Sequence, residues 1–485
     1  MTVENEYKLT IGIECHVQLK TKTKLFSGSL NQDDQSRPNV DVNHIDFGLP
    51  GALPVLNKDA IKLASRAAFA LNSQPQKFSK FDRKHYFYPD LPMGYQISQY
   101  DQPIILGGSV SFLSNDQIVK IGITRAHLES DAGKSIHPEG SDYSLVDLNR
   151  AGTPLLEIVS EPDIKSAMQA KQYAQTLYLL MRYADVTVGN LFFGNMRFDV
   201  NVSVSKDENL GKRAEIKNLN SFRSIERAIN YEYKRQVQLL KNNQEVHQET
   251  RGWDDNKGIT YLMRSKENAD DYRYMPDPDL PPVILDDMYI ASIKQSMPLL
   301  PDYWIDKLKK LNLDESIIYS LLEDGLDNQF SNLQFVVTLD PQDAKLISNY
   351  IVNIEIPEIK NSEAPILSIN QRQQLYLKIS SLARQNIISS SNIKVLIKDI
   401  LKLDKLPDID QYIAQNKLVQ NSDLDQLNGI VKKVILENPK VVEDIKAGVQ
   451  KAIGFLIGQI MKETKGQANP VLINKLLNEQ IKKEE

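Results

Sequence analysis

The stretch Ile11-Gly-Ile-Glu-Cys-His-Val-Gln-Leu19 indicates how the first part of this chain folds, because apolar and polar residues alternate along it. Successive side chains of a β-strand point to opposite faces, so the alternation predicts a strand with one apolar and one polar face. The apolar face carries Ile11, Ile13, Cys15, Val17 and Leu19. The polar face carries Glu14, His16, Gln18 and Lys20, and so offers a carboxylate and an imidazole on one side.

Other segments repeat this pattern and bring further acids to a polar face. In 197–205 the apolar residues alternate with polar ones that include Asp199, and in 213–217 Glu215 and Lys217 alternate with apolar residues. Glu157 interrupts the apolar run 155–159. Carboxylates gathered on a rigid sheet suit Mg²⁺, a hard cation that prefers oxygen ligands. The alternative is that they are ordinary polar residues on the wet face of an antiparallel sheet.

The hydrophobic period changes along the chain. Strand-like alternation continues to about residue 292, and beyond the proline-rich stretch 276–282 apolar residues recur every three to four positions, as in helices. A further division near Leu406-Pro407 precedes a last helical segment. We therefore predict an α+β fold with an antiparallel sheet in residues 1–292, a helical domain in 293–405 and a small helical tail domain in 406–485.

Composition and charge exclude several classes of protein. The 485 residues are 41% hydrophobic and 25% charged, which is globular rather than disordered or fibrous. A net charge of −5 argues against a general polyanion binder, so contacts with nucleic acid must use local patches. Residues 430–485 hold 10 Lys against 7 acids, which suits such a patch but is also typical of a solvated helix face.

The single cysteine and the lack of long apolar segments point to a reducing, cytoplasmic location. Cys15 alone forms neither an intramolecular disulfide nor a multi-thiolate zinc site, and its apolar strand position favours a buried structural role over that of a glutaminase nucleophile. The start of the chain lacks the pattern of a signal peptide. The apolar run 455–461 is too short to cross a membrane, so we expect no membrane association.

Two short segments mix cations with aromatic rings, and a third resembles a phosphate loop. Residues 81–90 and 271–274 have the mixture that suits base stacking and phosphate binding, although aromatic packing within an amphipathic strand would also explain it. Ala132-Gly-Lys-Ser135 resembles the end of a P-loop, but a P-loop requires glycine at position 128, where this chain has leucine. A P-loop is therefore not expected.

Several long motifs together resemble the B subunits of bacterial aspartyl/glutamyl-tRNA amidotransferases. These motifs lie in order along the chain, at residues 11–20, 80–90, 95–103, 146–162, 214–222, 248–251, 271–274, 454–461 and 465–470. The resemblance implies a catalytic domain like that of glutamine synthetase, and helical domains that hold the tRNA. It also implies a heterotrimer with an amidase, known as the A subunit, and with a small C subunit. The amidase supplies ammonia from glutamine through a channel.

The resemblance further implies a reaction and residue roles. In this family, ATP and Mg²⁺ serve to phosphorylate the side-chain carboxylate of Glu-tRNA(Gln) or Asp-tRNA(Asn), and ammonia then displaces the phosphate. The matched positions for metal binding are Glu14, His16, Glu129, Glu157, Asp199 and Glu215. Catalysis is assigned to Glu14, His16, Lys84, Arg125 and Arg150. Contacts with phosphate or the tRNA end are assigned to Arg83, Lys134, Lys217, Tyr272 and Arg273, and tRNA contacts in the tail to Lys451, Lys462 and Lys465.

The chain departs from the family pattern at three places. Ser130 replaces an acid next to the expected metal site, Phe192-Phe193 stands where two glutamates are common, and Met93 stands where lysine is common. If position 130 helps to hold Mg²⁺, its serine weakens that site; if it points away, Glu129 alone serves there.

Overall fold

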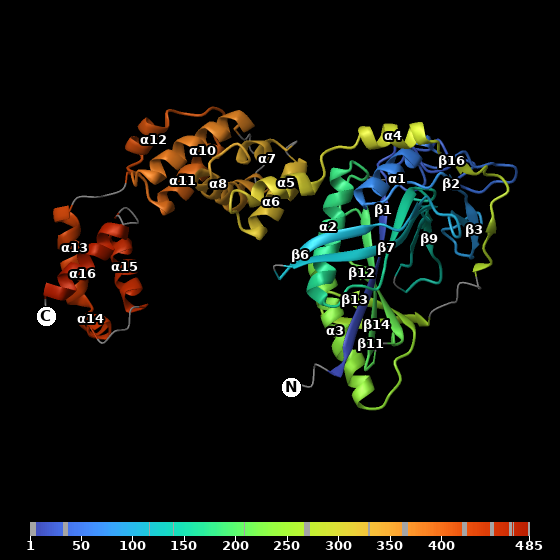
Figure 1. Ribbon diagram of the computed structural model, residues 1–485, viewed down its shortest axis with the longest axis horizontal. Coiled ribbons are helices and arrows are strands. Elements are labelled where there is room, and N and C mark those ends of the chain that lie inside the picture. Colours follow the sequence, from blue (N-terminus) through green and yellow to red (C-terminus); the bar gives the residue numbers. More distant parts are fainter. Residues whose placement is uncertain are drawn as a thin grey trace. The chain divides into compact units, whose positions relative to one another are not determined.

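The computed structural model describes residues 6–32, 37–115, 117–138, 140–207, 209–265, 272–327, 330–360, 367–419, 424–446, 451–464, 468 and 470–483. The chain divides into two compact units, Met1–Pro301 and Asp302–Glu485 (Figure 1). The first unit combines a large sheet with helices, and the second contains helices. The predicted α+β fold followed by helical regions is thus confirmed, while the division at residues 292 and 405 remains a prediction.

A single large sheet organises the first unit. Its described strands run in the order β14-β13-β12-β11-β1-β10-β7-β5, and β6 also pairs with β7. Every pair is antiparallel except β12 with β13. The strands are β1 (Lys8–Gln18), β5 (Ile105–Leu106), β6 (Ser109–Ser114), β7 (Gln117–Ser130), β10 (Pro154–Ser160), β11 (Met196–Ser205), β12 (Arg213–Leu219), β13 (Glu249–Asp254) and β14 (Ile259–Ser265).

The apolar face of this sheet packs against three helices. Ile13, Cys15 and Val17 of β1 are buried in one core with residues of α1 (Lys58–Ala70), α2 (Ala167–Tyr183) and α3 (Phe222–Lys241). Asn57, Ser166 and Ser221 cap these helices, each accepting a hydrogen bond from a backbone N–H of the first turn. α2 and α3 lie along one side of the sheet in Figure 1. Because the helices cover the apolar face, the polar residues of β1 lie on the other face.

Short strands extend the first unit beside the main sheet. β3 (Asp82–His85) pairs with β4 (Tyr95–Ser98) and β15 (Met275–Pro276), which brings the two cation-aromatic segments together. β2 (Phe78–Ser79) pairs with β16 (Val283–Ile284), and β8 (Lys134–Ile136) pairs with β9 (Leu145–Asp147). α4 (Asp287–Gln295) follows and packs against α1.

The regular elements described in the second unit are helices, and one isolated antiparallel bridge joins Ile388 and Val419. Its elements are α5 (Pro301–Lys309), α6 (Glu315–Asp327), α7 (Ser331–Val336), α8 (Pro341–Tyr350), the π-helix η3 (Ile351–Glu355), α9 (Ile356–Lys360), α10 (Ile369–Arg384), α11 (Ser390–Leu401), α12 (Ile409–Gln415), α13 (Leu424–Glu437), α14 (Pro439–Lys446), α15 (Lys451–Glu463) and α16 (Pro470–Lys483). The last four helices share a core of their own, which includes Leu427, Val431, Leu456 and Leu477. No helix in the described ranges is both long and apolar enough to cross a membrane.

Candidate active site

The polar face of the sheet aligns ionisable side chains across four neighbouring strands. β1 lies between β10 and β11, and His16 is opposite Glu157 of β10 on one side and Arg197 of β11 on the other. Glu157 is in turn opposite His127 of β7. Since directly opposite residues of paired strands share a face, these four side chains form one row across the sheet.

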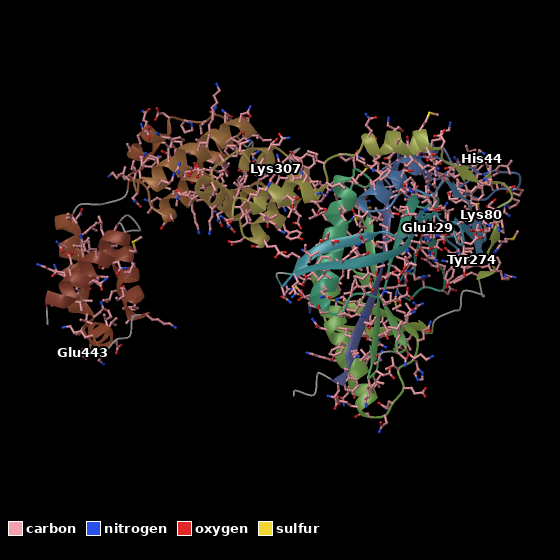
Figure 2. All side chains as sticks on the ribbon, in the orientation of Figure 1. His44, Lys80, Glu129, Tyr274, Lys307 and Glu443 are labelled. Atoms are coloured by element: carbon pink, nitrogen blue, oxygen red, sulfur yellow. The ribbon has the colours of Figure 1, made fainter. Side chains whose placement is uncertain are left out.

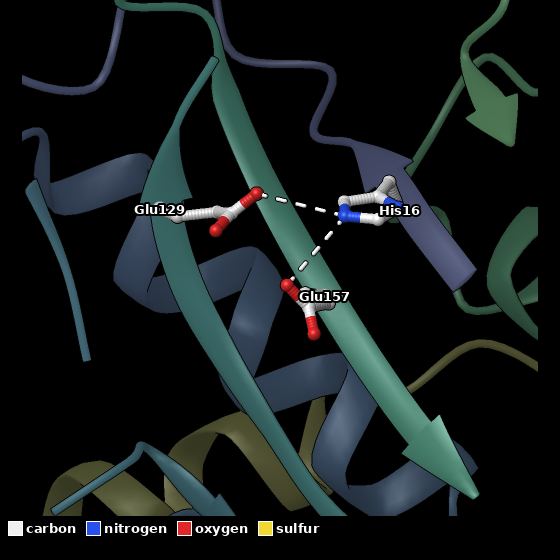
Figure 3. Close-up of side chains that lie close together, drawn as sticks. All are labelled: His16, Glu129 and Glu157. Carbon is white, nitrogen blue, oxygen red and sulfur yellow. Dashed lines mark ion pairs between the residues drawn. The ribbon is translucent and has the colours of Figure 1, made fainter. Parts of the chain in front are cut away.

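A group of three side chains at this row could hold a metal ion. The Nε2 atom of His16 lies 3.8 Å from Oε1 of Glu129 and 3.5 Å from Oε2 of Glu157. One potential ligand atom from each of the three residues lies within 4.8 Å of the other two (Figure 3). Among the described residues, this is the one group of three or more His, Cys, Asp or Glu side chains with such geometry. We call His16, Glu129 and Glu157 the triad.

The electrostatics of the triad follow from burial and from its two carboxylates. Burial opposes the charged imidazole, but Glu157, Glu129 and Asp199 outweigh this and raise the pKa of His16 to about 9. Burial and the neighbouring Glu157 raise the pKa of Glu129 to about 7. Burial also disfavours ionised Glu157, but the protonated His16 and the ammonium of Lys84 keep its pKa below the usual range. In the metal-free protein at neutral pH the triad therefore pairs a protonated His16 with an ionised Glu157, and a cation bound there would take the place of the His16 proton.

His127 is a neighbour of the triad that the sequence did not single out. Its Nε2 atom lies 3.5 Å from Oε2 of Glu157 and 3.8 Å from Oε2 of Glu129. Burial lowers the pKa of His127 to about 4, so its imidazole is neutral and able to donate an electron pair. The signal was present in the sequence, because His127 precedes Glu129 by two positions and such residues share a strand face.

Two cavities open on this face of the sheet. A cavity of about 340 Å³ is bounded by His16 and Glu129 together with Arg197, Asp199 and Lys217. A larger cavity of about 690 Å³ is lined by Glu14, Ser160, Asn201 and Arg213, among others. β1 contributes to both, since His16 lines the first cavity and Glu14 the second. The face thus offers separate spaces for more than one substrate group.

Comparison with known proteins assigns this chain to a family. The family model described as the GatB/GatE catalytic domain matches residues 9–291, and the model described as the GatB domain matches residues 334–481. Three relatives, each named as the B subunit of an aspartyl/glutamyl-tRNA(Asn/Gln) amidotransferase, are similar over nearly their whole length. The relative from Persephonella marina is 43% identical over 98% of this chain and 100% of its own. The relative from Caldicellulosiruptor saccharolyticus is 42% identical over 99% of this chain and 100% of its own length. The relative from Rickettsia bellii is also 42% identical, over 98% of each chain.

The chain belongs to the family of aspartyl/glutamyl-tRNA amidotransferase B subunits. The resemblance seen in the sequence motifs is confirmed. The match to the GatB/GatE catalytic domain includes all of the large sheet except Lys8, and therefore all three triad residues and both cavities.

The other acids assigned to metal binding lie beside the triad, with protein partners. In this member of the amidotransferase family, Glu14 accepts a hydrogen bond from Nδ2 of Asn201 at 2.9 Å. Nζ of Lys217 lies 2.6 Å from Oδ2 of Asp199 and 3.0 Å from Oε1 of Glu215. Burial disfavours the charged ammonium, yet these two carboxylates raise the pKa of Lys217. Lys217 therefore stays charged and balances both acids.

Two of the predicted cations lie near the triad. Lys84 on β3 lies with its Nζ 4.8 Å from the centre of the Tyr272 ring. Burial opposes its charge, but Glu129 and Glu157 outweigh burial and raise the pKa of Lys84. Arg125 precedes His127 by two positions on β7, and its buried Nε has no hydrogen-bond partner among the described residues. Tyr274 lies two positions after Tyr272 and is labelled with Glu129 in Figure 2. Burial raises the pKa of the Tyr274 hydroxyl to about 12.

The remaining predicted cations of the first unit have other partners or face solvent. Arg83 pairs with Asp277 at 3.0 Å and Asp279 at 2.7 Å. Arg150 donates to the carbonyl oxygens of Ala132 and Gly133 at 3.0 and 2.6 Å, and thereby shapes the chain after β7. The side chains of Lys134 and Arg273 are exposed, and the carbonyl oxygen of Arg273 lies 2.9 Å from Nδ1 of His85.

The structure also locates the residues that depart from the family pattern. Ser130 is buried and donates a hydrogen bond to the carbonyl oxygen of Ile97 at 3.3 Å, on the face of β7 opposite to Glu129. The serine therefore removes no ligand from the triad. Phe192 and Phe193 lie exposed on the loop before β11. Cys15 is fully buried, as predicted, and burial raises the pKa of its thiol.

Of the tail lysines assigned to tRNA, two belong to described helix residues. Lys451 and Lys462 are exposed at the two ends of α15. Lys465 lies outside the described residues.

Proposed function

We propose that this chain is the amide-forming member of an ATP-dependent carbon–nitrogen ligase that acts on misacylated tRNA. Its substrates are Asp-tRNA(Asn), Glu-tRNA(Gln) or both, and its products are the corresponding Asn-tRNA(Asn) and Gln-tRNA(Gln). It works in the cytoplasm within a heterotrimer, in which the amidase A subunit releases ammonia from glutamine and the small C subunit is the third member. The observation that carries the proposal is the triad beside a cavity lined by acids and by the cations Arg197 and Lys217, within the catalytic domain of this family.

The chemistry requires two steps. A carboxylate is a poor acyl donor because oxide is a poor leaving group. The side-chain carboxylate of the esterified amino acid first attacks the γ-phosphorus of ATP, and ADP leaves. Ammonia then attacks the carbon of the resulting acyl phosphate, the carbon–oxygen bond breaks, and inorganic phosphate leaves. Both steps move negative charge onto oxygen, so they need fixed cations rather than a protein nucleophile.

The residues present fit a hard divalent cation such as Mg²⁺. His16, Glu129 and Glu157 would hold it, because their ligand atoms already converge and two of the three are carboxylates. The ion would supply positive charge next to the phosphoryl group in transfer. Arg197 and Lys217 line the cavity beside the triad, where they can bind phosphate oxygens. Lys84 is charged and faces the same carboxylates, so it can orient the substrate carboxylate.

Transamidation by the assembled complex tests the proposal. The complex should form ADP only in the presence of misacylated tRNA, and should convert the esterified acid to its amide. Glu157→Gln should lower both rates by about a hundredfold or more, because it removes one charge at the phosphoryl site. Glu161→Gln, just beyond β10 and outside the triad, is the matched control. A complex that binds tRNA but forms no ADP would show a binding scaffold instead.

A further inference from the structure

Two exposed phenylalanines stand at the edge of the candidate active site without a role in the proposed chemistry. The side chain of Phe192 is 91% exposed and that of Phe193 is 53% exposed. Their ring centres lie 5.3 Å apart with the rings at 74°, so each keeps an uncovered surface. Apolar rings in water are unfavourable for a folded protein alone. Their exposure is explained if a ligand covers them.

The loop that carries these rings is held in place by hydrogen bonds. Oδ1 of Asn190 accepts from the backbone N–H groups of Phe192 and Phe193, at 3.0 and 3.3 Å. The backbone N–H of Asn190 donates to Oδ1 of Asn195 at 2.9 Å, and Nδ2 of Asn195 donates to Gln18 at 3.2 Å. Gln18 ends β1, so the loop is tied to the strand that carries His16, about 7 Å further back along it. A ligand therefore meets a prepared surface, which lowers the entropy cost of binding.

A small cavity lies between this loop and the cavity beside the triad. It has a volume of about 170 Å³ and is lined by Phe192, Phe193 and Phe222. Arg197, Phe198, Leu219 and Asn220 line both this cavity and the 340 Å³ cavity that contains His16 and Glu129. The two cavities thus adjoin at these four residues, and we call their combined lining the trough, with an aromatic end at Phe192 and Phe193 and a charged end at His16 and Glu129. The exposed Asn220 amide lies in the shared wall, where it can bond the polar edge of a ring.

We propose that the aromatic end binds the terminal base at the 3′ end of the tRNA, by stacking on Phe192 and Phe193. This inference rests on the proposed function. The amino acid is esterified to the terminal ribose, so when its side-chain carboxylate reaches the triad, the base on the same ribose lies only a few bonds away. A base has flat apolar faces and polar edges, which match the phenylalanine rings and the Asn220 amide.

Binding of altered tRNAs tests this inference without depending on catalysis. The probes are two tRNAs with the sequence of tRNA(Asn), one ending in adenosine and one in which the terminal ribose lacks its base. For the wild-type protein in its heterotrimer, we expect about tenfold tighter binding of the adenosine-ended tRNA, since stacking on aromatic side chains is lost with the base. In the double variant Phe192→Ala/Phe193→Ala the two dissociation constants should be equal. Phe192→Trp should keep the preference, and Ile118→Ala, at another highly exposed apolar residue, is the control.

The outcomes separate this inference from others. The same preference in the wild type and in the double variant would overturn it. Loss of complex assembly in the double variant, with an unchanged preference in whatever complex remains, would show that the loop contacts a partner protein instead. A preference that depends on the two phenylalanines, in a complex that forms no amide, would support the base site and reject the proposed function.

Discussion

His16 binds its proton more tightly in the folded protein than a free histidine does, and stability should therefore depend on pH. Its pKa rises from the usual 6.5 to about 9 because the triad carboxylates outweigh the opposing effect of burial. The stabilisation is complete below pH 6.5 and is lost as pH rises through 9. We expect metal-free protein to lose stability over this window, as measured by urea unfolding at a series of pH values.

Glu157→Gln should flatten that pH dependence, because it removes the strongest stabilising partner of the His16 imidazolium. His137→Gln changes an exposed histidine and serves as the control. Magnesium should reverse the trend, since a proton on His16 competes with a metal ion for Nε2. An equal slope in Glu157→Gln and in the parent protein would contradict the charge pairing described for the triad.

Ser130 tests whether the departure from the family pattern matters for metal binding. Its hydroxyl is buried and bonds the Ile97 carbonyl on the face away from Glu129. Ser130→Glu should therefore leave the magnesium concentration for half-maximal transamidation unchanged. It should also lower the free energy of unfolding by about 3 kcal/mol, because an unpaired charge enters the core. Ser111→Glu, at an exposed strand position, is the control for stability. A lower magnesium requirement in Ser130→Glu would show that position 130 reaches the metal.

At the scale of single elements, the alternation in the sequence predicts faces but not neighbours. It correctly placed Ile13, Cys15 and Val17 in the core, with Glu14 and His16 on the other face. It did not show that β10 inserts between β1 and β7, which sets Glu157 opposite both His16 and His127. Strand order depends on contacts between segments far apart in the chain, which no local period records.

Helix boundaries in the tail show a related limit. Val442, Ile445, Val449, Ile453, Leu456 and Ile460 fall on one helical stripe in the sequence. Among the described residues the structure has two helices there, since α14 ends at Lys446 and α15 begins at Lys451, while Val449 lies outside the described residues. Val442, Leu456 and Ile460 nevertheless share one core. The apolar period therefore predicts burial well, but it does not show where one helix ends and the next begins.

The π-helix η3 of the second unit ends at a buried acid that joins three elements. Glu355 accepts hydrogen bonds from Arg372 at 2.5 Å, from Asn332 at 3.2 Å and from the Tyr376 hydroxyl. If this carboxylate is removed, the buried guanidinium of Arg372 loses the negative charge that it pairs with. We expect Glu355→Ala to lower the free energy of unfolding of this unit by about 3–5 kcal/mol.

Tryptophan fluorescence can measure this change unit by unit. Trp253 lies on β13 and Trp304 on α5, so a Trp253→Phe background reports on the second unit alone. Glu358→Ala breaks a surface pair with Lys398 and is the matched control, with little expected change. If Glu355→Ala and Glu358→Ala unfold at the same urea concentration, the buried network does not hold η3 against α7 and α10.

At the scale of the whole molecule, the charge of the chain is unevenly distributed. Its net charge is −5, although residues 430–485 hold 10 Lys against 7 acids. The core of helices α13 to α16 is formed by residues between Leu427 and Ile481. α12 instead belongs with the preceding helices, because Asn392 donates to the carbonyl oxygen of Leu418 and Lys378 pairs with Asp410. A truncation after Val419 therefore removes the whole core of helices α13 to α16. It leaves in place the contacts between α12 and the preceding helices.

This truncation should weaken tRNA binding by the heterotrimer and reduce its salt dependence, while the amidase continues to hydrolyse glutamine. Each lysine that contacts a phosphate releases counterions on binding, so its loss lowers the slope of log affinity against log salt by about 0.7–0.9. The double variant Lys451→Gln/Lys462→Gln changes only exposed side chains and should lower the slope by about 1.4–1.8 if both lysines contact phosphates. Lys307→Gln/Lys309→Gln, on exposed positions of α5, is matched in charge. An unchanged dissociation constant and slope after truncation would show that helices α13 to α16 do not bind tRNA. Equal slopes in the two double variants would show that the tRNA contacts do not lie on α15.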